Sequence, residues 1–232
     1  MIQIRKADER GRFDFGWLDT RHTFSFGDYH DRRYMGFRSL RVINEDVVQP
    51  GLGFGMHPHR DMEIVTLVLS GALEHRDSLG NGEILRAGEL QRMTAGSGIM
   101  HSEFNPSPTE PVHLYQIWLR PRELGLTPGY EQRRFDPEAR DGCWQVVAAS
   151  DARERSLKIN QDATLRLGRV RPGESLVAEI APTRGAWFQM LDGRARVGDQ
   201  PLGTGDGVAV EELSSVTFQS DQGAEILWFD LA

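Results

Sequence analysis

The chain has 232 residues, 27 of them basic and 34 acidic, so its formal net charge is −7. The two signs are interleaved along the sequence, which argues against a nucleic-acid-binding protein because such proteins usually present a basic face. Its one cysteine, Cys143, excludes an internal disulfide and is typical of a reducing compartment, so we expect a cytoplasmic protein. No apolar run approaches the ~20 residues that cross a bilayer, and the charged residues 1–10 do not resemble an export signal, so we expect no membrane association.

Residues 12–37 contain many aromatic side chains among glycines and aspartates, without a helical period. We interpret them as short strands and turns that pack rings on a β core, in preference to a direct role in a ligand pocket. His22 and His30 in this segment have no second ligand type at matching strand spacing, and we interpret both as structural or surface histidines. We interpret His113, on a later predicted strand, as a partly buried structural histidine.

Runs of apolar and β-branched residues predict strands at 39–44, 64–69 and 112–119, the second of them buried from both sides. Residues 121–137 are polar and contain prolines, so we place a linker there, between domains 1–120 and 138–232. The second half contains no histidine but repeats the strand and turn rhythm of the first, which indicates a duplicated β-barrel. Only residues 151–157 suggest a short helix or turn.

The residues that suggest chemistry lie between Gly51 and Asn105. His57 and His59 are two residues apart, as are His101 and Glu103, and alternate residues of a strand point to the same face. Two such pairs on facing strands would converge on one point. Three imidazoles and a carboxylate suit a divalent first-row metal and leave coordination positions open for a substrate or oxygen.

The chain resembles the cupin superfamily and, more closely, its pirin family. The two cupin motifs are matched by Gly51, His57, His59 and Glu63, and by Gly98, His101 and Asn105, although Gly96 stands where the second motif usually has a proline. The pirin resemblance lies in residues 22–29, 40–46, 53–59 and 98–103. It implies an all-β bicupin fold of two tandem antiparallel barrels (double-stranded β-helix or jelly roll) with little helix, in which only the N-terminal barrel binds metal.

The same resemblance implies that His57, His59, His101 and Glu103 hold one metal, usually Fe(II), with Cu, Ni, Mn or Zn as alternatives. Family members are described either as quercetin 2,3-dioxygenases or as regulators that bind a protein partner. We therefore expect a dioxygenase acting on a flavonol-like phenol with O2, and the alternative is a metal-dependent regulator without turnover. Glu103 is the candidate catalytic base. Because two halves of one chain would cover each other's faces, we expect a monomer.

Glu63 competes with Glu103 for the role of fourth ligand. Each carboxylate has the strand spacing that places it on the face of a histidine, so geometry alone permits either. One carboxylate leaves a dication better able to acidify a bound hydroxyl, and the pirin resemblance assigns ligation to Glu103. We expect Glu63 either to accept the N–H of a ligating imidazole or to pair with Arg60 or Arg92.

Overall fold

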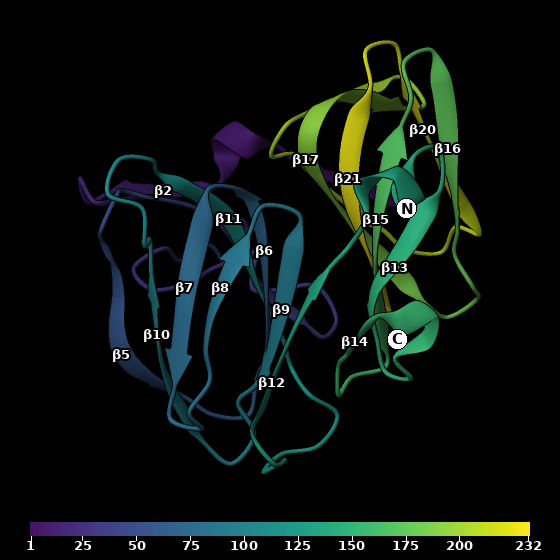
Figure 1. The fold of residues 1–232 in the computed structure, drawn as a ribbon. Helices are drawn as coiled ribbons and strands as arrows, with labels where there is room; N and C mark the ends of the chain where they lie inside the picture. Colours follow the sequence, from purple (N-terminus) through teal and green to yellow (C-terminus); the bar gives the residue numbers. More distant parts are fainter. The chain divides into compact units, whose positions relative to one another are not determined.

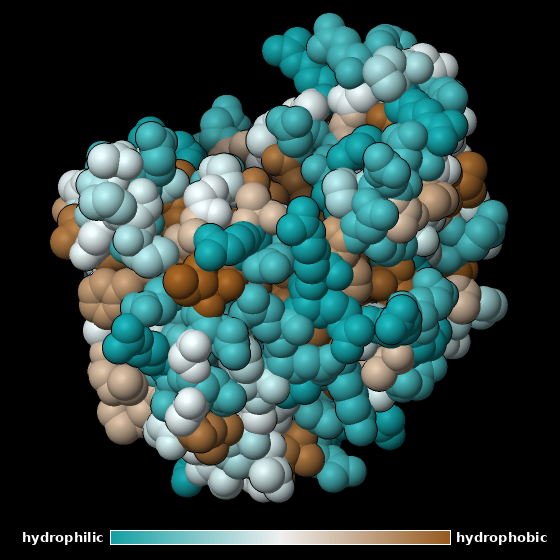
Figure 2. All heavy atoms as spheres, viewed as in Figure 1, coloured by the Kyte–Doolittle hydropathy of each residue, from teal (hydrophilic) through white to brown (hydrophobic).

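The computed structural model describes residues 1–232, and its regular secondary structure consists of antiparallel β strands and three short 3-10 helices. The chain forms two compact units (Figure 1). The N-terminal unit comprises residues 11–135 and 157–161, and the C-terminal unit comprises residues 1–10, 136–156 and 162–232. No helix in the structure has the length and apolar character that a membrane span requires. The face shown in Figure 2 is mostly hydrophilic, with scattered hydrophobic residues.

The N-terminal unit holds a seven-stranded sheet, in the order β12-β9-β6-β11-β4-β3-β2, and a four-stranded sheet, in the order β5-β10-β7-β8. Their strands are β2 (Gly11–Asp14), β3 (Leu18–His22), β4 (Leu40–Val48), β5 (Gly53–His59), β6 (Glu63–Ser70), β7 (Ala72–Asp77), β8 (Gly82–Arg86), β9 (Glu89–Thr94), β10 (Ile99–Phe104), β11 (Val112–Leu119) and β12 (Gly129–Arg134); β14 (Leu157–Lys158) also belongs to this unit.

Apolar packing explains why these segments form strands with buried faces. Residues 63–68 of β6 are buried without interruption, as the continuous apolar run predicts for a strand covered on both sides. Two apolar clusters involve this strand, one around Val68 and Leu114 and the other around Ile64 and Met93. The strands predicted around 39–44, 64–69 and 112–119 are therefore present as β4, β6 and β11.

The C-terminal unit is built around aromatic rings. Trp228 stacks on Phe188 with 5.6 Å between ring centroids and meets Trp144 edge-on at 5.2 Å, while Phe218 lies 4.8 Å from Phe188. Its elements are β1 (Ile2–Arg5), η1 (Ala7–Glu9), η2 (Pro137–Arg140), β13 (Trp144–Ala149), η3 (Arg153–Arg155), β15 (Ala163–Val170), β16 (Glu174–Glu179), β17 (Gly185–Val197), β18 (Gln200–Gly203), β19 (Gly207–Val210), β20 (Ser215–Ser220) and β21 (Ala224–Leu231). This histidine-free interior offers no imidazole to a metal.

The boundaries of the units differ in position from the segments that composition suggested. Residues 129–134, inside the expected linker, form β12 and pair with β9, so they extend the seven-stranded sheet. Residues 2–5 pair with β19 and so belong to the C-terminal unit. The short helix expected in 151–157 is the three-residue η3. The hydrogen-bonded strand order describes open sheets, and it does not show the two closed barrels expected from the repeat.

Gly96 sits where only a residue without a side chain fits. Its φ is +48°, and a Cβ there would lie 2.0 Å from the carbonyl oxygen of Leu126. We expect Gly96→Ala to lower the unfolding stability by at least ~2 kcal/mol, because an L-residue in this region costs roughly 1–2 kcal/mol before any steric clash. Gly82→Ala is the control, since a Cβ at Gly82 meets nothing within 4 Å and its φ is ordinary. Denaturant unfolding of both variants measures the difference, and equal stabilities would contradict the steric argument.

Candidate metal centre and pocket

Strand β10 lies between β5 and β7 and brings together histidine and carboxylate side chains from the three strands. His101 pairs across the sheet with His57 on β5 and with Asp77 on β7, and Glu103 pairs with His75. A register irregularity on the β5 side falls between His101 and Glu103. Because alternate residues share a face, these side chains project from the same side of the four-stranded sheet.

Three histidines form the first cluster, as predicted from their spacing. His57, His59 and His101 each offer a ring nitrogen, and these nitrogens lie within 4.8 Å of one another. The ring centroids of His57 and His101 are 4.4 Å apart, and those of His59 and His101 are 4.8 Å apart. Such a group of convergent imidazoles is the donor set that zinc, copper, nickel or iron(II) accepts.

The protonation of these rings leaves nitrogen lone pairs directed into the cluster. Nδ1 of His57 lies 2.7 Å from the carbonyl oxygen of Gly55 and therefore donates, which leaves Nε2 as the free nitrogen. Nε2 of His59 and Nε2 of His101 are buried and have no hydrogen-bond partner. Burial, together with the neighbouring His57, lowers the pKa of His59 to about 4 and that of His101 to about 2, so both are neutral at pH 7. The residues present therefore fit a divalent metal.

Behind His101 lies a buried pair that the sequence interpretation missed. Nε2 of His75 lies 3.1 Å from Oδ2 of Asp77, and Nδ1 of His75 lies 3.5 Å from Nδ1 of His101. Although burial raises the pKa of Asp77, hydrogen bonds from Asn81 and His75 lower it below its ordinary value, so this carboxylate is ionised. His75 then donates to Asp77 and accepts at Nδ1 from His101, which fixes the His101 tautomer with Nε2 unprotonated.

Glu103 is fully buried and held from the opposite sheet. Its Oε1 accepts from Nε2 of Gln91 at 2.9 Å, and its Oε2 accepts from Nε2 of Gln116 at 2.6 Å. Burial raises the pKa of Glu103, whereas the nearby His75 and His57 rings and the two amide bonds lower it. The Glu103 carboxylate, His75 and His101 form a second cluster with ligand atoms within 4.8 Å of one another. His101 is common to both clusters.

The two glutamines belong to a row of polar residues that crosses the inner strands of the seven-stranded sheet. Cross-strand pairing connects Gln91 to Thr66, Thr66 to Gln116, Gln116 to Asn44 and Asn44 to His22. Directly opposed residues lie on the same face of an antiparallel sheet. The row therefore continues from the Glu103 partners to Asn44 and His22.

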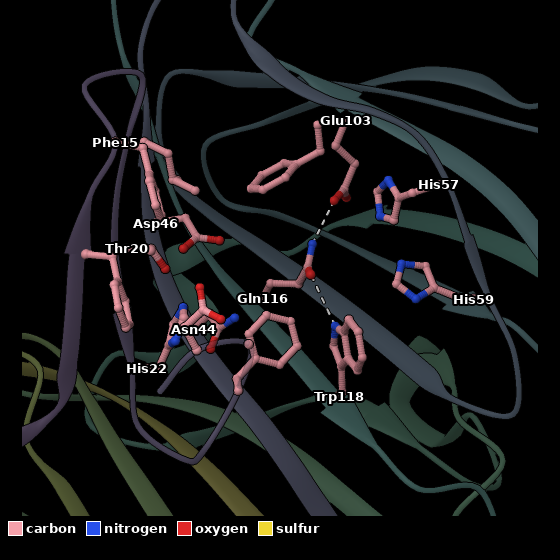
Figure 3. Close-up of a pocket in the computed structure, with 16 residues that line it drawn as sticks. Phe15, Thr20, His22, Asn44, Asp46, His57, His59, Glu103, Gln116 and Trp118 are labelled. Carbon is pink, nitrogen blue, oxygen red and sulfur yellow. Dashed lines mark hydrogen bonds between the residues drawn. The ribbon is translucent and has the colours of Figure 1, made fainter. Parts of the chain in front are cut away.

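A cavity of about 330 Å³ opens beside the histidines and follows this row (Figure 3). Such a volume falls in the usual range for small-molecule sites. The aromatic residues in its wall are Phe13, Phe15, Phe26, Phe54 and Trp118. The preference for a core role over a pocket role in residues 12–37 was therefore wrong for Phe13, Phe15 and Phe26, which line the pocket. His22, interpreted as structural, lines it as well.

Asp46 is a buried carboxyl group in the same pocket. Burial raises its pKa to about 7, while a hydrogen bond from Thr20 lowers it and the charges of Glu103 and Glu45 raise it further. Thr20 and Asp46 are directly opposed on β3 and β4. Below pH 7 this carboxyl is neutral, and above pH 7 it is ionised.

Glu63 lies in a different network from the histidines. Its carboxylate accepts from the backbone N–H of Asn160 at 3.0 Å, from the Asn160 side chain and from Oγ of Thr94. The partners expected from the sequence, a ligating imidazole or Arg60 or Arg92, are not its partners here. His113 is half-buried and bonded to Glu45 at 2.9 Å, in agreement with a structural role.

The fold and the donor set define a cupin-type β protein with a candidate metal centre. The pirin family model matches residues 3–119, and a model described as the quercetinase C-terminal cupin domain matches residues 146–231. The chain belongs to the pirin family. It is 51% identical over 231 residues to a quercetin 2,3-dioxygenase of Escherichia coli K12, a match that covers 100% of this chain and 99% of the relative.

Solved structures agree with this assignment. YhhW from Escherichia coli superposes with a TM-score of 0.97 at 50% identity, covering 100% of this chain and 98% of that one. A structure of the same bacterial pirin in complex with nickel(II) superposes with a TM-score of 0.95 at 49% identity, covering 100% and 99% of the two chains. A putative quercetin 2,3-dioxygenase of Pseudomonas aeruginosa is 36% identical over 233 residues, covering 100% of both.

We expect metal binding to weaken when the direction of the His75–Asp77 hydrogen bond is reversed. In Asp77→Asn the new amide N–H donates to Nε2 of His75, so His75 protonates at Nδ1 and forces the His101 proton onto Nε2. We expect metal affinity to fall ~10–100-fold, as for other residues that orient a ligand. Calorimetric titration measures the affinity, and ¹⁵N NMR of the metal-free protein reports the His101 tautomer. An unchanged tautomer would contradict the assigned hydrogen-bond directions.

The pKa of Asp46 predicts a titration near neutrality in the metal-free protein. ¹³C NMR of its carboxyl carbon should show a midpoint at about pH 7. Thr20→Val should move the midpoint upward, because the lost hydrogen bond stabilised the ionised form. Glu45→Gln should move it downward, because a repelling negative charge is removed. Shifts of the same sign in both variants would show that these causes are assigned wrongly.

Proposed function

We propose that this protein is a metal-dependent dioxygenase that opens flavonols such as quercetin with O2 in the cytoplasm. One observation carries the proposal: ring nitrogens of His57, His59 and His101 converge beside an aromatic-walled cavity, and His101 also groups with the buried carboxylate of Glu103. Relatives that match over 99–100% of their length carry the names quercetin 2,3-dioxygenase and putative quercetin 2,3-dioxygenase, which supports the substrate class. The proposal includes a monomer whose two units are each a cupin-like barrel, with one metal per chain, held by the N-terminal unit.

The proposed ligands are His57, His59 and His101 through their Nε2 atoms, with Glu103 as the fourth. Iron(II) is the proposed metal, and the nickel(II) complex of a relative supports a site that accepts other divalent ions. Affinity alone does not select among first-row metals, because nitrogen and oxygen sites follow the same general order of preference. When bound, the metal acts as a Lewis acid that lowers the pKa of a coordinated substrate hydroxyl.

Within this site Glu103 is the proposed base for the flavonol hydroxyl proton. Its burial raises its pKa, so it holds a proton more readily than an exposed glutamate does. Gln91 and Gln116 hold the two carboxylate oxygens in place. Gln116 in turn accepts from the indole N–H of Trp118 at 3.1 Å, so the aromatic wall and the base are positioned together (Figure 3).

The outer face of the four-stranded sheet favours a second candidate function. In this function the protein is a metal-dependent regulator that binds a protein partner. Met56, Met100 and Phe104 are 55%, 44% and 36% exposed on β5 and β10. By strand alternation they lie on the face opposite to the ligand histidines. Exposed apolar side chains are a feature that protein-binding surfaces share. This function predicts metal binding without turnover, so an activity measurement separates the two.

The dioxygenase proposal predicts metal-dependent quercetin consumption. Aerobic protein loaded with one equivalent of metal should bleach the flavonol absorbance and release carbon monoxide. Glu103→Gln should weaken metal binding and lower the rate at least ~100-fold, because it removes both a ligand and the base. Glu63→Gln is the matched control, since Glu63 is equally buried but bonded to Asn160 and Thr94.

Glu63→Gln should keep one equivalent of metal with a loss below the ~10–100-fold of residues that orient a ligand, because Glu63 contacts Asn160 and Thr94 and no ligand histidine. If Glu63→Gln abolished metal binding while Glu103→Gln kept it, the ligand assignment would be reversed. If no first-row metal supported turnover, the enzyme proposal would give way to the regulator. Two tightly bound metals per chain would contradict the proposal that only the N-terminal unit binds metal.

A further inference from the structure

The pocket end away from the ligand histidines contains three buried polar atoms without partners. They are Nδ1 of His22, Oδ1 of Asn44 and Oδ1 of Asp46. Their side chains line the same cavity as His57 and His59, and the three residues are only 7%, 4% and 4% exposed. Buried polar groups are nearly always satisfied in folded proteins, so three orphans in one place indicate a missing ligand.

All three atoms are hydrogen-bond acceptors. His22 donates its other ring N–H to the backbone of Phe26, and burial lowers its pKa, so Nδ1 of the neutral ring carries a lone pair. Oδ1 of Asn44 is an amide oxygen and Oδ1 of Asp46 a carboxyl oxygen. The Asp46 oxygen accepts when the carboxyl is ionised, so a ligand that satisfies all three atoms must bring O–H or N–H groups.

The strand register holds these acceptors side by side. His22 is directly opposed to Asn44 across β3 and β4, and Thr20 is directly opposed to Asp46. Asn44 and Asp46 are two residues apart on one strand and share a face. Figure 3 shows Thr20, His22, Asn44 and Asp46 together at one end of the pocket, with His57 and His59 at the other.

The walls around the acceptors select a flat ligand. The ring of Phe13 lies 5.4 Å from the His22 ring, and Phe26 meets His22 edge-on at 5.3 Å. Phe26 also meets Trp118 edge-on at 5.2 Å, which continues the aromatic wall toward the histidines. A planar aromatic molecule with peripheral hydroxyl groups fits walls of this kind, because ring faces and edges provide its apolar contacts.

We propose that His22, Asn44 and Asp46 form a hydroxyl-recognition subsite, which binds the phenolic O–H groups of the part of the flavonol that points away from the metal. The inference rests on the proposed function and adds that the protein selects substrates by their outer phenolic hydroxyl groups. A site built to hydrogen-bond substrate hydroxyls discriminates against analogues that lack them, because its own polar groups are then left unpaired.

The test compares two flavonols that present the same groups to the metal. Quercetin carries hydroxyl groups on both outer rings, whereas 3-hydroxyflavone keeps the metal-facing hydroxyl and carbonyl but has no other hydroxyl. Dissociation constants are measured without oxygen on zinc-loaded protein, by quenching of tryptophan fluorescence. The variants are Asn44→Leu and Asp46→Leu, which remove acceptors at nearly constant volume, and Phe13→Leu, which changes the wall and removes no acceptor.

We expect wild-type protein to prefer quercetin by at least about 10-fold, and each acceptor variant to reduce that preference about 5–10-fold with the affinity for 3-hydroxyflavone unchanged within about twofold. Phe13→Leu should weaken both ligands alike. Unchanged zinc stoichiometry and circular dichroism confirm that the variants fold.

Two results would overturn the subsite. If either acceptor variant weakened both flavonols equally, or left the preference for quercetin intact while the wild type binds and turns over quercetin, the subsite is wrong and the proposed function stands. If wild-type protein bound neither flavonol, both the subsite and the proposed function would fail.

Discussion

The buried carboxylate of Glu103 is the constraint on which the geometry of the N-terminal unit depends. A charge removed from water is costly unless hydrogen bonds replace its hydration. Here the replacement comes from Gln91 on β9 and Gln116 on β11, strands of the sheet opposite β10. Satisfying the carboxylate thus joins the two sheets at a fixed separation. The same contact positions the proposed base, places His101 two residues away beside the other histidines, and leaves the cavity open along the rest of the polar row.

That polar row gives the pocket two chemically distinct ends. At one end Gln91 and Gln116 use their N–H groups on Glu103, and at the other end Asn44 and His22 present acceptors with no partner. Both ends arise from one cross-strand line, since these residues are paired through Thr66 in neighbouring strands. Strand register therefore fixes the distance between the metal-facing and hydroxyl-facing parts of a bound molecule. A ligand must therefore match this distance and also fit between the aromatic walls.

The sequence was sufficient where chemistry depends on neighbours along one strand. Alternation alone placed His57 beside His59, and the structure brings both together with His101. It was insufficient where partners come from strands far apart in the chain. His75 contacts His101 only because of the pairing of β7 with β10, although the spacing of His75 and Asp77 was a visible signal. The pocket role of Phe13, Phe15 and Phe26 was not predicted for a different reason. Composition does not reveal which side of a short strand faces a cavity.

The two candidate carboxylates, Glu63 and Glu103, have different roles: the first is structural, and the second is the proposed ligand and base. Glu63 has the spacing of a cupin ligand, yet it begins β6, where it pairs with Leu119 and Thr94. There its carboxylate receives the backbone and side-chain N–H groups of Asn160, so it fastens residues 157–161 to the unit in which they pack. This leaves Glu103 as the carboxylate proposed to join the three histidines as a ligand. A dication held by such a set would keep a net positive charge, which would lower the pKa of a coordinated hydroxyl. Assigning Glu63 to the scaffold is therefore consistent with the electrostatics that the proposed chemistry requires.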